Sequence, residues 1–260
     1  MPDAAIGGSQ HAFLSAPLDP EPPRHAFRSV VAKPALPYNE NPMFQTIRVI
    51  GRGRVGSAVA ARLIERGHRL DDVGELVLLC VPDSAIGAVA QSIAPGPWIA
   101  HTSGATPLAT LAPHARRFGV HPLQTIVRGR GPEQLDGAWA AVTGESLEAT
   151  SRAAWLATEL GLRPFEIRDE MRALYHAGAA VASNYLVTLY RAASRMLEAA
   201  GAPAAALVPL MRRTIDNGFE LTGPIARGDW QTIEAHLAAI RRYAPELEPM
   251  YRALADQTRT

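Results

Sequence analysis

Hydrophobic positions between residues 44 and 168 alternate between the spacing of strands and the spacing of helices. Apolar and β-branched runs predict strands at 46–50, 76–81, 98–101, 118–121, 138–142 and 163–167. Helices are predicted at 55–65, at 85–93, and from the cap Thr106 and the first-turn Pro107 to just before Gly119. Strands separated by helices predict a mostly parallel sheet with both faces covered.

The pattern changes near residue 168, where the strand signals end. Asp169 starts a helical pattern that extends to about Ala200, and further helices are predicted near 203–219, 230–243 (capped by Asp229) and 246–257. We therefore predict an α/β domain over 44–168 and an all-α domain over 169–260, with a cleft between them. Residues 1–43 contain eight prolines and no sustained apolar period. This predicts a disordered tail or, alternatively, an over-extended gene start with Met43 as the natural first residue.

The segment Gly51-Arg52-Gly53-Arg54-Val55-Gly56 follows the first predicted strand and opens the first predicted helix. In this context the pattern is typical of a turn that binds a dinucleotide pyrophosphate with free amides of the helix N-terminus; a glycine turn kept only for packing is the alternative. Only residues 68–74 separate this helix from the next strand. We expect no second strand and helix there, so Asp71 and Asp72 are poorly placed to bind a ribose. The predicted fold class is a shortened Rossmann-like parallel sheet with a C-terminal helical domain.

Polar residues follow three of the predicted strands, at the sheet edge where ligands of such folds bind. They are Val81-Pro82-Asp83-Ser84, His101-Thr102-Ser103-Gly104 and His121-Pro122-Leu123-Gln124-Thr125. The long helix of the second half adds Tyr175-His176-Ala177-Gly178 and Ser183-Asn184-Tyr185, in which His176 and Ser183 share a face. The alternative is that these residues only cap helices or satisfy one another in the core. Three clusters at one edge favour a cleft.

Composition excludes several kinds of chemistry. The 26 basic and 25 acidic residues leave a formal charge of +1, so neither nucleic acid nor an anionic membrane is an expected partner. Cys80 is the only cysteine, which excludes an internal disulfide and a cysteine-based zinc site, and we predict no metal. Lys33 is the only lysine and lies in the tail, so Schiff-base catalysis is excluded. We expect a cytoplasmic protein, because no apolar run is long enough to span a membrane.

These motifs resemble those of a bacterial family that joins a Rossmann-like half to a domain of unknown function, DUF2520. The resemblance extends from Met43 to the C-terminus and includes Thr222-Gly223-Pro224 and Arg227-Gly228-Asp229. The family is similar in build to 6-phosphogluconate dehydrogenase-like and ketopantoate reductase-like oxidoreductases. The resemblance implies NADP as cofactor, with NAD as the alternative, and a homodimer made through the helical domain.

We therefore expect hydride transfer from a nicotinamide to a carbonyl or imine carbon, with a small, ketopantoate-like 2-oxo acid as the first substrate class to consider. His176 is the expected proton donor, because a histidine titrates near working pH and no lysine is available. Asn184 and Ser183 are expected to hold the substrate, while Ser103, His121 and Gln124 line the cleft. The expected cofactor contacts are the glycine turn 51–56, Val81, Pro82, Asp83, Ser103 and Gly104. The alternative is a non-catalytic nucleotide or metabolite sensor.

Overall fold

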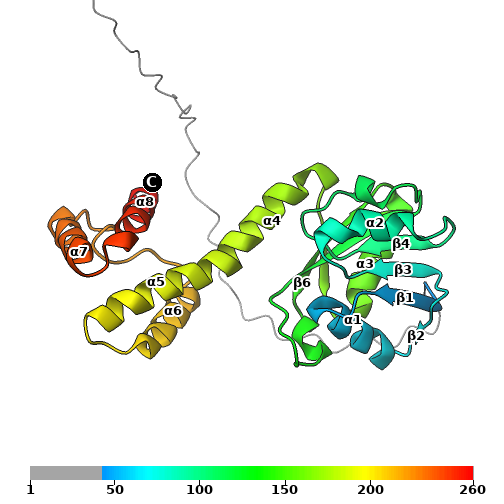
Figure 1. Cartoon of the computed structure of the whole chain (residues 1–260), viewed down its shortest axis with the longest axis horizontal. Coiled ribbons are helices and arrows are strands. Elements are labelled where there is room, and N and C mark those ends of the chain that lie inside the picture. The colour runs from blue at the N-terminus through cyan, green and yellow to red at the C-terminus, as the bar shows by residue number, and fades with distance from the viewer. Residues whose placement is uncertain (1–42, 260) are drawn as a thin grey trace, which may run out of the picture.

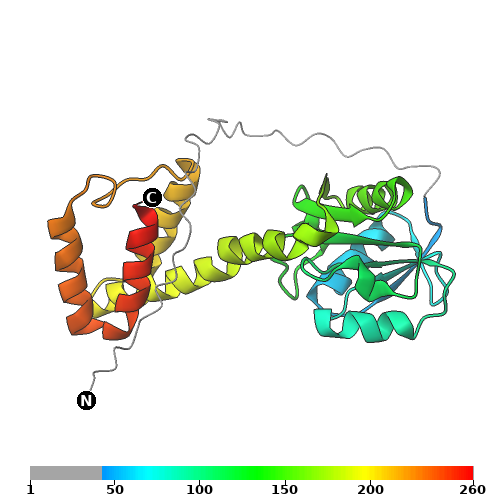
Figure 2. The ribbon, with the colours of Figure 1, turned by 90° about the horizontal axis from the view of Figure 1, so that it is seen from above.

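The computed structural model describes residues 43–259, which form a sheet domain and a helical domain joined by one long helix (Figure 1). The predicted tail lies outside the described residues except for Met43. Figure 2 shows the same separation from above, with the long helix as the bridge between the two domains. The class predicted from the sequence, a Rossmann-like sheet followed by helices, is confirmed.

The described strands make one seven-stranded sheet in the order β2-β1-β3-β4-β5-β6-β7. Neighbouring strands are parallel except β5 and β6, which are antiparallel. The strands are β1 (Thr46–Ile50), β2 (Arg69–Leu70), β3 (Leu76–Leu79), β4 (Trp98–His101), β5 (Arg117–Leu123), β6 (Trp139–Gly144) and β7 (Arg163–Glu166). The carboxyl ends of β1, β3, β4 and β5 therefore open at one edge of the sheet, where the polar motifs lie.

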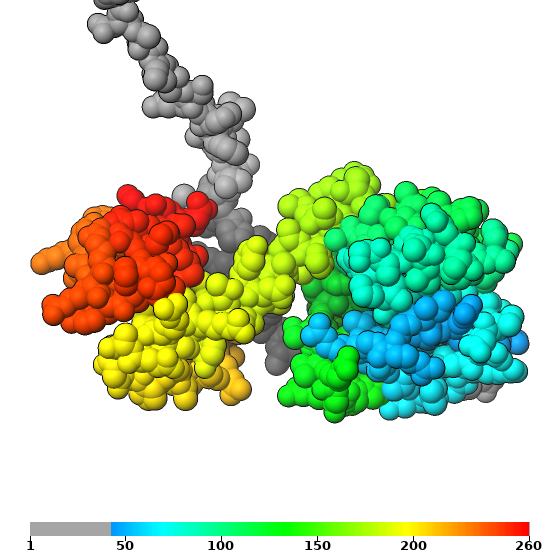
Figure 3. Space-filling model, viewed as in Figure 1, coloured from blue at the N-terminus to red at the C-terminus, as the bar shows by residue number. Residues whose placement is uncertain are grey.

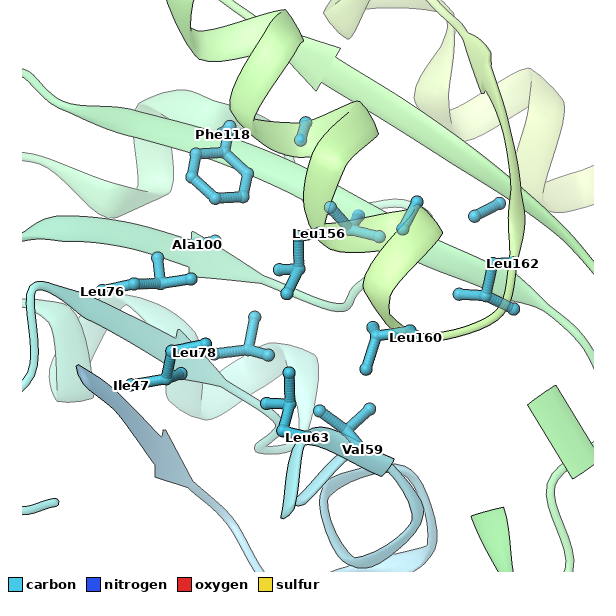
Figure 4. Packing of buried hydrophobic residues seen from close by; sticks show 14 of the residues in the cluster. Ile47, Val59, Leu63, Leu76, Leu78, Ala100, Phe118, Leu156, Leu160 and Leu162 are labelled. Carbon is cyan, nitrogen blue, oxygen red and sulfur yellow. The ribbon is translucent and has the colours of Figure 1, made fainter. Parts of the chain in front are cut away.

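Helices cover both faces of the sheet: α1 (Arg54–Glu65) and α3 (Leu147–Glu159) on one, α2 (Ile86–Gln91) on the other. Successive side chains of β3 point to opposite faces of the sheet. Leu76 and Leu78 pack into the core under α1 and α3, whereas Val77 and Leu79 pack under α2. Figure 4 shows the larger of the two cores, between α1, α3 and the sheet.

The structure corrects the prediction that no second strand fits between α1 and β3. Arg69 and Leu70 form β2, which pairs in parallel with Thr46 and Ile47 of β1. Two residues are too few to give a periodic signal, so this strand is visible only through its pairing. The part of the prediction that concerned a helix is right, because no helix lies between β2 and β3.

The predicted helix from Thr106 to just before Gly119 is also wrong. The chain makes only a short 3₁₀ turn, Leu108–Leu111, before β5 begins. Pro113 has no amide hydrogen and clashes with the preceding turn, so the helical pattern cannot continue past it.

The helical domain begins with α4 (Arg172–Ala180), which continues through a π-helical segment (Val181–Tyr185) into α5 (Leu186–Ala199). The other helices are α6 (Leu207–Asp216), α7 (Trp230–Tyr243) and α8 (Glu248–Thr258). The predicted cap of α7 is confirmed, since the carboxylate of Asp229 accepts a hydrogen bond from the Thr232 amide at 3.1 Å. In the described part of the chain, none of the helices combines the length and the apolar character that crossing a membrane requires.

Candidate active site

The glycine turn between β1 and α1 is shaped by two glycines that cannot carry a side chain. Gly51 has φ = +108°, and a Cβ placed on it would lie 2.3 Å from the Cys80 carbonyl oxygen. A Cβ on Gly56 would lie 2.0 Å from the Gly51 carbonyl oxygen. Gly53 differs, because its backbone is extended and a Cβ there would meet nothing within 4 Å. The first and third glycines therefore shape the turn, and the second leaves open space above it.

The N-terminus of α1 faces this space and fits an anionic group. The helix has no side-chain cap and no acidic residue in its first turn, so its first amides and its dipole remain available. Arg52 and Arg54 are exposed beside it and add positive charge. The turn therefore fits the phosphates of a dinucleotide, with Gly53 providing the room.

A cavity of about 310 Å³ lies on one side of the turn. It is lined by Arg48, Val49, Arg52, Ala60, Leu70, Asp71 and Asp72. Because β2 exists, both aspartates follow its carboxyl end, where a Rossmann-like sheet binds the adenosine ribose. A hydrogen bond from Arg69 lowers the pKa of Asp71. The structure therefore removes the reason for the prediction that these acids are poorly placed, namely the absence of a second strand.

A second cavity, of about 670 Å³, lies between the carboxyl end of β5 and the α4–π segment. The predicted residues among those that line it are Arg54, Val55, His121, Gln124, His176, Ser183 and Asn184. Tyr175 also lines it, although sequence reasoning did not select it as a site residue. The structure thus brings the end of the glycine turn together with polar groups from both domains.

His121, Tyr175 and His176 form a contiguous aromatic cluster in this cavity. The Nδ1 atom of His121 lies 2.7 Å from the Tyr175 hydroxyl, and the rings of His121 and His176 meet nearly at right angles with centroids 5.7 Å apart. Gly104 makes room for them: a Cβ there would lie 2.6 Å from His176 Cδ2 and 2.9 Å from His121 Cε1. Gly104, predicted as a cofactor contact, therefore borders the histidine cluster.

Burial controls the charge of this cluster. Burial, assisted by the nearby His176 and Arg172, lowers the pKa of His121 to about 4, and Asp83 opposes the shift only weakly. Burial also raises the pKa of Tyr175 to about 12. Both side chains are therefore neutral over the whole range in which most enzymes work.

Ser103 does not reach this cavity. Its side chain is buried, and its Oγ lies 2.8 Å from both Asp83 Oδ2 and Thr106 Oγ1 while it accepts hydrogen bonds from the amides of Ala105 and Thr106. The hydroxyl is fully engaged in holding the loop after β4 to the turn after β3. The expected role of Ser103 in catalysis is therefore not supported by its position, and Val81, Pro82 and Asp83 belong to the turn that it ties down.

A buried arginine that sequence reasoning missed joins α4 to the sheet domain. Arg172 is 1% exposed; its Nη1 donates to the Ser103 carbonyl at 2.9 Å and its Nε to Asp169 at 3.0 Å. Asp169 in turn accepts from the Leu108 amide. One turn farther along α4 come Tyr175 and His176, so this anchor sets where they stand. The only sign of this anchor in the sequence was the i, i+3 spacing of Asp169, Arg172 and Tyr175, which places the three residues on one face of a helix.

The fold is of the Rossmann-like class with a helical second domain, and its glycine turn fits a dinucleotide. Residues 138–258 match the model of a family described as a domain of unknown function, DUF2520, which confirms the resemblance over that part of the chain. No curated protein matches the chain.

Solved structures share the whole architecture. A Bacteroides fragilis protein described as an NADP oxidoreductase is 22% identical, with a TM-score of 0.69, covering 83% of this chain and 98% of its own. A Thermotoga maritima protein is 22% identical, with a TM-score of 0.63 and coverages of 82% and 100%. A reductive aminase from Aspergillus terreus, solved with NADPH and ethyl levulinate, is 18% identical, with a TM-score of 0.57 and coverages of 82% and 93%. At these identities the likeness establishes the fold.

Proposed function

We propose that the protein is a nicotinamide-dependent oxidoreductase that reduces a carbonyl or imine group of a small molecule. One observation carries the proposal: the 670 Å³ cavity joins the glycine turn, through Arg54 and Val55, to the cluster of His121, Tyr175 and His176. A phosphate-binding turn and a proton-donating cluster that share one cavity are what hydride transfer with protonation requires. NADP-linked reductases among the similar structures support the same class.

Residues of this chain fit each part of the cofactor. The amides at the start of α1, with Arg54, would hold the pyrophosphate, and the cavity beside β2 would take the adenosine. NADP is the proposed cofactor because Arg48 and Arg52 offer positive charge to a 2′-phosphate; Asp71 and Asp72 in the same cavity suit the free 2′-hydroxyl of NAD, which makes NAD the alternative. When bound, the nicotinamide supplies the hydride.

The protein supplies the proton and the substrate contacts. We assign proton donation to His176, which lines the cavity, and substrate binding to Asn184 and Gln124 with Ser183 beside them. The described residues lining this cavity include no carboxylate that would repel an anion, and Gln124 and Asn184 each carry an amide that can donate hydrogen bonds. The proposed substrate is therefore a small, ketopantoate-like 2-oxo acid. The proposed setting is the cytoplasm, where nicotinamide cofactors are available.

The helical domain offers a surface for a homodimer. Its exposed large apolar side chains include Val181, Tyr185, Leu186, Val187, Leu189, Leu210 and Ile215. Figure 3 shows the linking helix standing clear between the two domains on the visible face. Exposed apolar side chains in this number favour a protein interface, and a second copy of the chain is the proposed partner.

Titration of the pure protein with NADPH and with NADH, followed by nicotinamide fluorescence, tests the proposal. We expect tighter binding of NADPH, and consumption of it when pyruvate, 2-oxobutyrate or ketopantoate is added. Binding without turnover of any carbonyl or imine would favour a non-catalytic sensor, and absence of binding would refute both functions.

A further inference from the structure

Tyr175 is held at the cavity by contacts from two strands. Its hydroxyl meets His121 Nδ1 of β5 at 2.7 Å, and its ring packs edge-on against His121 and against Phe165 of β7, with centroids 5.5 and 5.9 Å apart. These contacts fix both the ring and the hydroxyl before any substrate arrives. Such prior order is what makes a hydrogen-bond donor effective in a transition state.

Counting hydrogens in this pair leaves one donor. A neutral imidazole carries a single N–H. When Nδ1 holds this proton, it donates to the Tyr175 oxygen and leaves the phenolic hydrogen free; when Nε2 holds it, the phenol donates to Nδ1 instead. The proposal concerns the first tautomer. The nearby Ser183 offers no such hydrogen, because its hydroxyl donates to the Ala179 carbonyl at 2.7 Å. Tyr175 is therefore the better-placed hydroxyl donor on the α4–π segment.

We propose that Tyr175 binds the carbonyl oxygen of the substrate through this hydrogen and that His121 is its positioning residue. The inference deepens the proposed function and rests on it. As hydride adds to the carbonyl carbon, the C=O π pair moves to the oxygen, and a fixed neutral donor stabilises that growing negative charge. Tyr175 keeps its own proton throughout, and His176 gives the oxygen its proton.

The charges around the pair agree with this division of roles. The groups facing His121 are His101 on β4, Asp83 after β3, and Arg172, Tyr175 and His176 on α4. Burial, with the positive charge of Arg172, keeps His121 neutral, and a phenol whose pKa is about 12 is a poor match for proton transfer near neutral pH. Tyr175 thus suits hydrogen-bond donation better than general acid catalysis.

A purely structural bond is the competing explanation, and the chain contains a matched control for it. His236 Nδ1 and the Tyr251 hydroxyl also lie 2.7 Å apart, with ring centroids at 6.0 Å, and neither residue lines the cavity. Tyr251→Phe therefore breaks the same kind of bond at a distance from the proposed chemistry.

The test compares turnover in these variants, with NADPH and whichever of pyruvate, 2-oxobutyrate or ketopantoate the wild type reduces. Tyr175→Phe should lower kcat by about a hundredfold, the usual cost of losing one such donor, without weakening NADPH binding, whereas Tyr251→Phe should leave kcat unchanged. His121→Asn, whose amide lies near the Nδ1 position, should keep more activity than His121→Gln. Equal kcat in Tyr175→Phe and wild type, or no difference between the two His121 variants, would overturn the inference.

A measurement without substrate separates this inference from the proposed function. The ¹⁵N chemical shifts of ring-labelled histidines report which nitrogen carries the proton. Tyr175→Phe should change the tautomer balance of His121 but not of His236, and Tyr251→Phe should do the reverse. An unchanged His121 spectrum in Tyr175→Phe would overturn the pairing even if no carbonyl is reduced. Changed spectra with no turnover of any probe would instead count against the proposed function.

Discussion

At the scale of single residues, the two histidines that line the larger cavity differ in their contacts. His176 lines it and packs its ring against that of His121, His121 is hydrogen-bonded to Tyr175, and Gly104 leaves the space in which the two imidazoles meet. His176 thus has a different task from its neighbour, although both are histidines in one cavity.

Replacing His176 by asparagine tests the proposed proton donor. We expect kcat to fall by roughly a hundredfold or more, the usual contribution of a general acid, while NADPH affinity and melting temperature stay close to wild type. Turnover, affinity and melting are measured on one preparation. A fall in activity that only follows the folded fraction would make His176 a core residue, and full activity would end the assignment.

Buried histidines also predict how stability depends on pH. Burial lowers the pKa of His101 to about 3 and that of His121 to about 4, from an ordinary value of 6.5. Between the folded-state pKa values and 6.5, the unfolded chain binds more protons than the folded chain. The stability that the two neutral histidines contribute is therefore fully present above about pH 6.5 and is lost as the pH drops towards 4. Each histidine contributes a slope of up to about 1.4 kcal/mol per pH unit.

Urea unfolding at pH 7.5 and pH 5 measures this effect, and His101→Leu serves as the comparison. Neither ring nitrogen of His101 makes a hydrogen bond of normal geometry among the described residues, so the apolar replacement removes a titrating group at little cost in hydrogen bonding. The variant should lose less stability than wild type on going to pH 5. An equal loss in both proteins would contradict the assignment.

At the scale of elements, the start of α1 and the π segment carry the site. The extra residue in the π turn Val181–Tyr185 changes the helical phase, and Ser183 and Asn184 still line the cavity with His176. The uncapped first turn of α1 faces the open space at Gly53.

Gly53→Val tests the glycine turn as the phosphate site. Because Gly53 has an extended backbone and open surroundings, the valine should fill the phosphate space with little loss of stability, and NADPH binding measured by calorimetry should be lost. Gly51→Ala is the contrasting variant: its φ of +108° and the Cys80 carbonyl 2.3 Å from the new Cβ should lower the melting temperature itself. Unchanged binding in a folded Gly53→Val would place the phosphates elsewhere.

At the scale of the whole molecule, a single helix connects the domains (Figures 1 and 2), and Arg172 anchors its first turn. The apolar face of that helix is the surface on which we propose that a second copy packs.

Leu189→Arg should convert the proposed dimer to a monomer, because a charge at a half-exposed apolar position of α5 cannot be buried without a partner. Sedimentation velocity measures the oligomeric state. Leu147→Arg is the control: Leu147 is 90% exposed at the start of α3 in the sheet domain, so the same charge should leave the state unchanged. A wild-type protein that sediments as a monomer at micromolar concentration would refute the homodimer.

Apart from β2 and the helix wrongly predicted after Thr106, the order of strands and helices was determined by the sequence itself, because hydrophobic period and capping are local properties. Strands at 46–50 and 98–101, the helix at 230–243 and the cap Asp229 all agree with the predictions. The glycine turn at residues 51–56 was equally predictable from the sequence, since a tight turn between a strand and a helix requires residues without side chains. These features needed no knowledge of distant neighbours.

Only the tertiary structure decided which polar residues meet. β2 forms by pairing with β1, and the hydroxyl of Ser103 is hydrogen-bonded to Asp83 and Thr106. The hydrogen bond between His121 and Tyr175 joins residues 54 positions apart in the chain. Such contacts depend on how α4 docks against the sheet, which is set by the buried Arg172 and its partners. A pattern along the chain reports which residues are buried, but the packing of two domains decides what each buried polar atom touches.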